Sequence, residues 1–250
     1  RTLPVTNPAT AEQLADLPVA TPVDVERAAS AAARAFQSWR RVPAVQRAGT
    51  LLTIGRLIRR DETRLATIVT LEQGKRLSEA LQEIRNCADT FEWMAEEGKR
   101  TYGRIVPART LDTDQFVRLE PVGPVAAFSP WNFPGVLACR KVATALAAGC
   151  TVVLKPAEET PGIMVAIPAV CIEAGLPAGA LNILYGVPGE ISSQLIVSPH
   201  IRKISFTGSI PVGQQLAVQA GAVTKKITLE LGGHAPVIVA EDVDVDRVGE

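Results

Sequence analysis

The sequence predicts an α/β protein in which a doubly wound parallel sheet is preceded by an N-terminal helical region. Three observations support this prediction. Apolar residues recur at helical spacing through most of the first hundred residues. From Pro121 onward, short apolar runs alternate with helix-length segments, the pattern typical of strand–helix–strand units. Hydrophobic residues make up 47% of the 250-residue chain, which is enough apolar material for a large core.

The N-terminal helices are predicted from a capping pattern and from periodicity. Thr21 precedes Pro22, so a capping threonine is followed by a proline suited to the first helical turn. Leu51, Ile54 and Ile58 recur at helical spacing, and Gly74 interrupts a later part of the pattern. We expect helices over residues 23–39, 44–60, 64–72 and 75–100.

The second half of the chain alternates between strands and helices. Residues 113–120 alternate in character and suit a strand with two different faces, which is able to leave the main body. Parallel strands are expected at residues 122–128, 151–154, 181–185, 203–206 and 226–229. The helices expected between them cover residues 136–148, 162–174, 190–197 and 212–220.

The charge balance gives no reason to expect nucleic acid or a membrane as a partner. The chain carries 26 basic and 26 acidic residues, so its formal net charge is +0. No apolar stretch approaches the ~20 residues of a membrane-spanning helix, and the N-terminal residues do not form a secretory signal. We therefore expect a cytoplasmic protein. Arg1 stands where a methionine would normally begin a chain, which indicates a segment of a longer protein.

The cysteines and histidines do not indicate a metal site. None of them has the spacing of zinc ligands, and the cysteines fall within apolar or small-residue segments. We expect no metal and reduced thiols in the core. The residues concerned are Cys87, Cys139, Cys150, Cys171, His200 and His234.

A polar or glycine residue follows each of the five predicted strands. In doubly wound sheets, ligands collect at the carboxyl ends of the strands, where loops and helix N-termini supply backbone donors. The candidates, in chain order, are Asn132, Lys155 and Glu158, Gly186, Gly208 and Ser209, and Glu230.

Two pairs of these residues suit a cofactor that carries phosphate. The chain has no Gly-x-Gly-x-x-Gly segment, so a dinucleotide must be held in another way. Gly208 and Ser209 stand between a strand and a helix, where they suit a phosphate, although on their own a glycine turn capped by serine is the simpler interpretation. Lys155 ends a buried strand and needs a partner, which a cofactor would supply; the alternative is a surface pair with Glu158.

Two further residues suit catalysis. Asn132 lies between bulky aromatic residues and two prolines, so its amide is held rigidly, as an oxyanion hole requires. The alternative is an aromatic packing cluster with a capping asparagine. Glu230 precedes two glycines that bend freely, so its carboxylate could move between positions as a general base. The alternative is a glutamate that caps a turn.

Two motifs resemble the NAD(P)-dependent aldehyde dehydrogenase superfamily. They are Pro-Trp-Asn-Phe-Pro at residues 130–134 and Leu-Glu-Leu-Gly-Gly at residues 229–233. The resemblance extends over essentially the whole chain and implies a Rossmann-like fold. Residues 92–103, together with Arg140 and Lys141, resemble the succinate-semialdehyde dehydrogenases in particular.

The resemblance implies a role for each candidate. Asn132 would donate to the oxygen of a thiohemiacetal, and Glu230 would be the general base in thioester hydrolysis. Arg140 would bind the far carboxylate of the substrate, since a guanidinium holds a carboxylate bidentately; the alternative is a solvated arginine at a helix start. A carboxylate at position 158 would repel a 2′-phosphate, so we expect NAD, with NADP possible. The implied cofactor-binding residues are Pro130, Trp131, Lys155, Glu158, Gly186, Gly208, Ser209 and Leu231.

The same resemblance implies a domain division. Residues 1–110 would be the helical part of the cofactor-binding domain, and residues 111–121 the start of an oligomerisation hairpin. Residues 122–230 would be the Rossmann-like NAD-binding core, and residues 231–250 the start of a catalytic domain. The full-length protein would be a homodimer or homotetramer.

The nucleophile of this family is a cysteine that we expect beyond Glu250. A thiolate forms the tetrahedral adduct with an aldehyde far better than water does. Cys139 is nearest to Asn132 in sequence, but its helical setting does not resemble the cysteine loop of the family. Two readings follow: part of an enzyme that oxidises a small aldehyde, most simply succinate semialdehyde, or a non-catalytic dinucleotide-binding or structural module. Glutarate and 2-oxoglutarate semialdehydes are alternative substrates.

Overall fold

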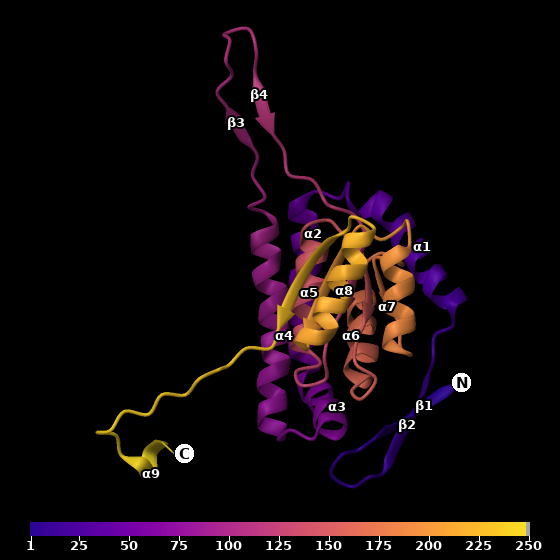
Figure 1. Cartoon of the computed structure of the whole chain (residues 1–250), viewed down its shortest axis with the longest axis vertical. Coiled ribbons are helices and arrows are strands. Elements are labelled where there is room, and N and C mark those ends of the chain that lie inside the picture. The colour runs from indigo at the N-terminus through magenta and orange to yellow at the C-terminus, as the bar shows by residue number, and fades with distance from the viewer. Residues whose placement is uncertain (249–250) are drawn as a thin grey trace.

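The computed structural model of the chain describes residues 1–248 and confirms the α/β fold. Its centre is a parallel sheet with helices on both faces (Figure 1). The spatial order of the strands is β7-β6-β5-β8-β9, so the chain winds from β5 towards one edge and then crosses to the other. The strands are β5 (Val125–Phe128), β6 (Val152–Lys155), β7 (Leu181–Ile183), β8 (Lys203–Gly208) and β9 (Lys226–Leu231).

The register of the sheet brings the carboxyl ends of the strands to one edge. Phe128 of β5 aligns with Lys155 of β6 on one side and with Phe206 of β8 on the other. Glu230 of β9 aligns with Thr207 of β8. The loops that follow these strands therefore share one end of the molecule.

One face of the sheet carries the larger helical layer. The buried side chains of this layer pack with Ala127 of β5 and Leu154 of β6 around Phe91 and Leu146, all of which are fully buried. The helices are α2 (Ala44–Arg60), α3 (Glu62–Gln73), α4 (Leu77–Gly98), α5 (Val136–Ala147) and α6 (Gly162–Glu173).

The opposite face carries three helices, α1 (Pro22–Trp39), α7 (Pro188–Val197) and α8 (Ile210–Ala222). They bury side chains from the other face of β5, β6 and β8, including Phe128, Val153 and Phe206. Although α1 is first in the chain, it therefore packs beside α7, while Trp39 at its end reaches the core of the opposite layer.

The predicted helices and parallel strands are confirmed apart from their end residues. Thr21 caps α1 in a capping box, in which its side chain accepts from the Asp24 backbone and the Asp24 carboxylate accepts from the Thr21 backbone. Helix α3 ends just before Gly74, as expected.

The expectation of a mostly helical N-terminal region missed residues 2–18. These residues form an antiparallel hairpin of β1 (Thr2–Thr6) and β2 (Gln13–Pro18). Only Val5 and Leu17 are buried in it, and they pack against Tyr185 beyond the end of β7. With so few apolar positions, local periodicity carries little signal, and a distant part of the chain stabilises the hairpin.

A second hairpin projects from the end of the molecule (Figure 1). Its strands are β3 (Arg104–Val106) and β4 (Gln115–Val117), which are antiparallel. The strand expected over residues 113–120 is β4, and its partner begins before residue 111, where we expected the hairpin to start. Ile105 and Phe116 are 78% and 70% exposed.

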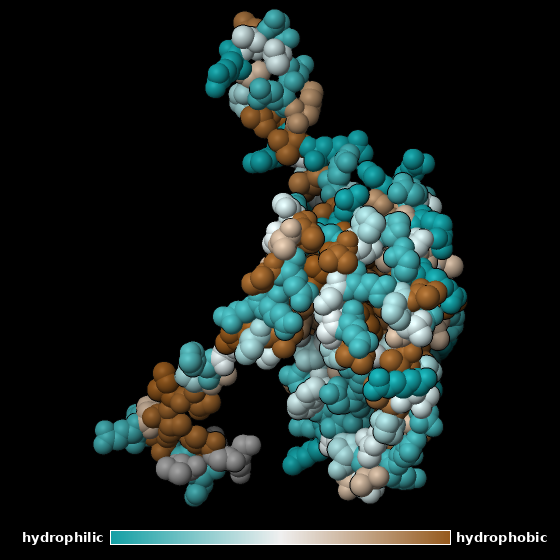
Figure 2. Space-filling model, turned by 45° about the vertical axis from the view of Figure 1, so that its right-hand side comes forward, coloured by the Kyte–Doolittle hydropathy of each residue, from teal (hydrophilic) through white to brown (hydrophobic). Residues whose placement is uncertain are grey.

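After Gly232 the chain extends away from the body and reaches the short helix α9 (Val245–Val248) (Figure 1). This extended segment carries exposed apolar side chains, Val237 and Ile238 among them, and Figure 2 shows a hydrophobic surface on it. Within residues 1–248, no helix combines the length and the apolar character needed to cross a bilayer.

Candidate functional site

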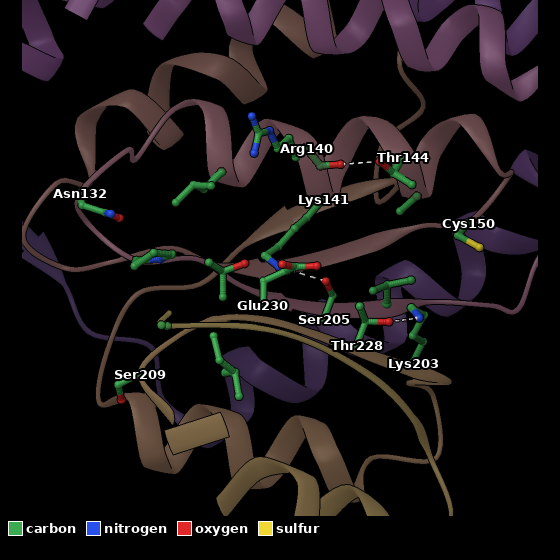
Figure 3. A pocket seen from close by; sticks show the side chains of 18 of the residues that line it. Asn132, Arg140, Lys141, Thr144, Cys150, Lys203, Ser205, Ser209, Thr228 and Glu230 are labelled. Atoms are coloured by element: carbon green, nitrogen blue, oxygen red, sulfur yellow. Dashed lines mark hydrogen bonds between the residues drawn. The ribbon is translucent and has the colours of Figure 1, made fainter. Parts of the chain in front are cut away.

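An open cavity of about 1100 Å³ lies on one face of the sheet, beside α5 (Figure 3). Successive side chains of β8 and β9 point to opposite faces of the sheet. The apolar ones face α7 and α8, and the polar ones line the cavity. The polar residues that these two strands contribute are Lys203, Ser205, Thr207, Thr228 and Glu230.

Asn132 and Glu230 line this same cavity (Figure 3). Asn132 belongs to the loop between β5 and α5, whereas Glu230 lies in β9 at the far side of β8. The two side chains thus reach one space from different walls. An amide donor and a carboxylate that share a cavity are the groups that oxyanion stabilisation and water activation require.

Lys141 of α5 is a cavity residue to which the sequence assigned no role. Its Nζ donates to Ser205 Oγ at 3.1 Å, beside Glu230 (Figure 3). Burial lowers the pKa of Lys141 to about 8, an effect that the Glu230 carboxylate opposes and the Lys203 ammonium strengthens. The sequence signal was weak, because a lysine next to Arg140 on a helix resembles ordinary surface composition.

Arg140 also lines the cavity, one residue before Lys141 on α5. Its backbone carbonyl accepts from Thr144 Oγ1 at 2.6 Å, which is a contact within the helix. Among the described residues, no carboxylate forms an ion pair with its guanidinium. The Arg140 guanidinium could therefore bind an anion in the cavity.

Pro130, Trp131, Gly208, Ser209 and Leu231 complete the group of expected site residues in the cavity wall. The Ser209 side chain occupies the N-cap position of α8 but makes no capping hydrogen bond. Its hydroxyl and the first turn of α8 therefore remain available to a phosphate.

Three expected residues lie outside this cavity and form a separate cluster. Lys155 ends β6 with 6% exposure, and its Nζ donates to Glu158 Oε2 at 2.5 Å. Glu158 Oε1 accepts from the Gly186 backbone N–H at 3.2 Å. Gly186 has a φ of +146°, a backbone conformation that glycine adopts most easily. The structure thus joins Lys155, Glu158 and Gly186 beyond the ends of β6 and β7.

The donors present fit a dinucleotide spread along this edge of the sheet. A cationic and carboxylate cluster lies beyond β6 and β7, and an uncapped helix start lies after β8. Two buried hydroxyls next to these segments, Ser129 and Thr160, have no hydrogen-bond partner in the described residues. No group of metal ligands occurs within residues 1–248.

The cysteines do not supply a nucleophile to the cavity. All four are buried, and Cys139 is fully buried in the same core as Cys87. Cys150 lines the cavity, but it is 3% exposed and burial raises the pKa of its thiol. Within residues 1–248, no accessible cysteine thiol accompanies Asn132 and Glu230.

Fold and site together define a doubly wound α/β domain that carries an amide and a carboxylate at the carboxyl edge of its sheet. The model of the aldehyde dehydrogenase family matches residues 1–250. The chain belongs to the aldehyde dehydrogenase family.

Curated relatives match nearly the whole chain. It is 50% identical over 245 residues to the 4-(hydroxymethyl)benzenesulfonate dehydrogenase TsaD1 of Comamonas testosteroni, a match that covers 98% of this chain and 51% of that protein. It is 44% identical over 246 residues to the succinate-semialdehyde dehydrogenase [NADP(+)] GabD of Escherichia coli, again covering 98% and 51%. The chain therefore spans about half the length of the curated relatives it matches.

Solved structures agree with this assignment. The crystal structure of succinate-semialdehyde dehydrogenase from Burkholderia pseudomallei matches with a TM-score of 0.95 and 43% identity. The match covers 98% of this chain and 51% of that one.

The environment of Lys141 leads to a prediction about its titration. Replacing Glu230 by glutamine removes the carboxylate that favours the Lys141 ammonium, so Glu230→Gln should lower the pKa of Lys141 below about 8. Competitive acetylation across a pH series, read by mass spectrometry, measures this pKa. Lys225 is the internal control, because burial lowers its pKa without a contribution from Glu230. An unchanged Lys141 pKa, or an equal shift at Lys225, would contradict the prediction.

Proposed function

We propose that this chain is part of an NAD-dependent aldehyde dehydrogenase that oxidises a semialdehyde, succinate semialdehyde first among the candidates, to the carboxylate. A cysteine in another part of the protein adds to the aldehyde, and the thiohemiacetal becomes a thioester that water hydrolyses. NAD, when bound, accepts the hydride. The observation that carries the proposal is the common cavity of Asn132 and Glu230.

In this reaction Asn132 stabilises the developing oxyanion. The prolines at positions 130 and 134 restrict the loop, and the Asn132 side chain lines the cavity. An amide held in place donates to the oxyanion without reorganising during the reaction. Asn132 thus lowers the barrier to thiohemiacetal formation.

Glu230 activates the hydrolytic water. It lies beside the Gly232–Gly233 pair at the end of β9, on the opposite side of the cavity from the β5–α5 loop. A carboxylate in that position removes a proton from water as the water attacks the thioester carbonyl. The acid product then leaves and the thiol is free again.

The two roles predict different kinetic defects in the full-length protein. Asn132→Ala removes an oxyanion donor and should lower kcat roughly 10²–10³-fold. Glu230→Gln should leave the formation of the thioester intact, so one equivalent of NADH appears in a burst and steady turnover falls roughly 10²–10⁴-fold. Stopped-flow absorbance of NADH measures both effects.

Glu190→Gln is the matched control, since it makes the same carboxylate-to-amide change at an exposed position of α7. It should leave the burst and the steady rate unchanged. The non-catalytic alternative, in which the chain is a dinucleotide-binding or structural module, is supported if the full-length protein produces no NADH with any aldehyde tested.

We propose that the substrate carries an anionic group away from its aldehyde. Arg140 supports this, because its guanidinium lines the cavity and has no ion-pair partner among the described residues. One of the two curated relatives is named for a sulfonate, 4-(hydroxymethyl)benzenesulfonate, and the other for a carboxylate, succinate semialdehyde. Glutarate semialdehyde, 2-oxoglutarate semialdehyde and sulfonated aldehydes also carry an anionic group away from the aldehyde. They are the alternative substrates.

The substrate assignment is tested with Arg140→Met. Loss of a charge-assisted hydrogen bond should raise KM for succinate semialdehyde roughly 10–100-fold. The uncharged aldehyde butanal is the control, and its KM should change by less than about twofold, since it has no group for Arg140 to bind. Steady-state kinetics with both aldehydes measures the ratio. An equal rise in both KM values would mean that Arg140 shapes the cavity without recognising the anion.

We propose that the protein prefers NAD over NADP and that Glu158 causes this preference. Its carboxylate is held by Lys155 and by the Gly186 N–H, and there it would repel a 2′-phosphate. Glu158→Gln removes the negative charge and leaves the buried Lys155 cation, so kcat/KM with NADP should rise about tenfold relative to NAD. Glu159→Gln is the matched control, because Glu159 is the adjacent, exposed carboxylate. An equal response of both variants would contradict the assignment.

We also propose that the β3–β4 hairpin joins subunits in a homodimer or homotetramer of the full-length protein. Ile105 and Phe116 support this, because each is more than two-thirds exposed on a hairpin that projects from the body. Apolar side chains in such a position are typical of protein interfaces. The division of the chain into residues 1–110, 111–121, 122–230 and 231–250 likewise stays a proposal.

A further inference from the structure

A buried ion pair lies directly behind the loop that carries Asn132. Lys75 precedes α4 and Glu83 lies within it, and their side chains are 9% and 1% exposed. Lys75 Nζ donates to Glu83 Oε2 at 2.6 Å. Burying two charges costs desolvation free energy unless both groups also form further hydrogen bonds. The other contacts of Lys75 and Glu83 therefore indicate what the pair does.

Glu83 uses its second oxygen to hold the start of α5. Glu83 Oε1 accepts from the Gly135 N–H at 2.8 Å and from the Val136 N–H at 3.2 Å. These N–H groups belong to the first residues of α5, which lack partners within their own helix. The loop backbone is also pressed against α4, since a Cβ at Gly135 would lie 3.1 Å from Cys87 Sγ.

Lys75 holds the other side of the loop. Its Nζ donates to the Asn132 carbonyl oxygen at 3.0 Å and lies 4.1 Å from the centre of the Phe133 ring. The ion pair therefore contacts the chain both before and after Pro134. It binds the Asn132 backbone through the carbonyl and leaves the side-chain amide free to face the cavity.

Burial of the aromatic residues does not replace these contacts. Trp131 and Phe133 are 53% and 49% exposed, so neither anchors the loop in the core. The polar contacts of Lys75 and Glu83 accordingly hold the loop on both sides of Pro134.

We propose that Lys75 and Glu83 are positioning residues for the oxyanion donor: the pair fixes the backbone around Asn132 so that its amide meets the developing oxyanion. This inference rests on the function proposed above. An oxyanion donor acts in the transition state, and small displacements of such groups reduce rates far more than they weaken binding of substrate. Loss of the pair should therefore lower kcat and leave the KM for the semialdehyde and the KM for NAD nearly unchanged.

The test is a double-mutant cycle in the full-length enzyme. Lys75→Gln should lower kcat roughly tenfold or more, with KM for the semialdehyde and for NAD within about twofold of their original values. In the Asn132→Ala background the same change should lower kcat by less than about twofold, since the group that Lys75 positions is already gone. Steady-state kinetics of the four proteins measures this coupling.

A second variant covers the case in which Lys75→Gln does not fold because Glu83 is left buried and unpaired. The pair Lys75→Met with Glu83→Gln removes both charges, and glutamine retains an acceptor for the Gly135 N–H. It should lower kcat by a similar factor and lose that effect in the Asn132→Ala background. Lys99→Gln is the matched control, because Lys99 pairs with Glu96 at the far, exposed end of α4; its kcat should not change.

Two results would overturn the inference, and they can be told apart. If Asn132→Ala lowers kcat and the Lys75 variants either leave kcat unchanged or lower it by the same factor in both backgrounds, the pair does not act through Asn132, and only the positioning role fails. If Asn132→Ala retains full activity, the oxyanion role of Asn132 fails, and the inference fails with it.

Discussion

The structure depends on the parallel register of β5, β8 and β9. The hydrogen-bond ladder aligns Phe128 with Phe206 and Thr207 with Glu230. The loops that follow these strands therefore begin at the same edge of the sheet. Asn132 and Glu230 are far apart in sequence and belong to different strands or loops, yet the ladder gives them one cavity. A slip of one residue in β9 would turn Glu230 to the opposite face and place an apolar neighbour in the cavity.

The cavity at the carboxyl edge of the sheet forms because the two helix layers cover the strands unequally. Helices cover both faces of β5 and β6, whereas on the α5 side the polar residues of β8 and β9 remain open to the cavity. Three of the lysines near the apolar layers have polar partners: Glu158 pairs with Lys155, Glu83 pairs with Lys75, and a hydroxyl beside a carboxylate accepts from Lys141. Groups that are paired and hydrogen-bonded in this way have little freedom to reorganise, which is the condition for electrostatic catalysis.

The sequence alone determined the fold class and most of the elements, because periodicity is a local property of the chain. Apolar spacing in 44–60 and the Thr21–Pro22 cap predict helices whatever surrounds them, and the helices are present. Position after a strand was sufficient to nominate Asn132, Gly208, Ser209 and Glu230, since the ends of parallel strands converge in any doubly wound sheet. The two signature motifs identified the family, which the family model confirms.

Only the tertiary structure decided which of these residues meet and what holds them. It separated Lys155, Glu158 and Gly186 from the cavity of Asn132, although all follow strands of one sheet. It brought Lys141 beside Glu230, and it joined Lys75 and Glu83 to a loop some fifty residues away. It also formed the β1–β2 hairpin around two apolar side chains. The physical reason is the same in each case: burial, shifted pKa values and ion pairs arise from contacts between distant segments, and local sequence does not encode those contacts.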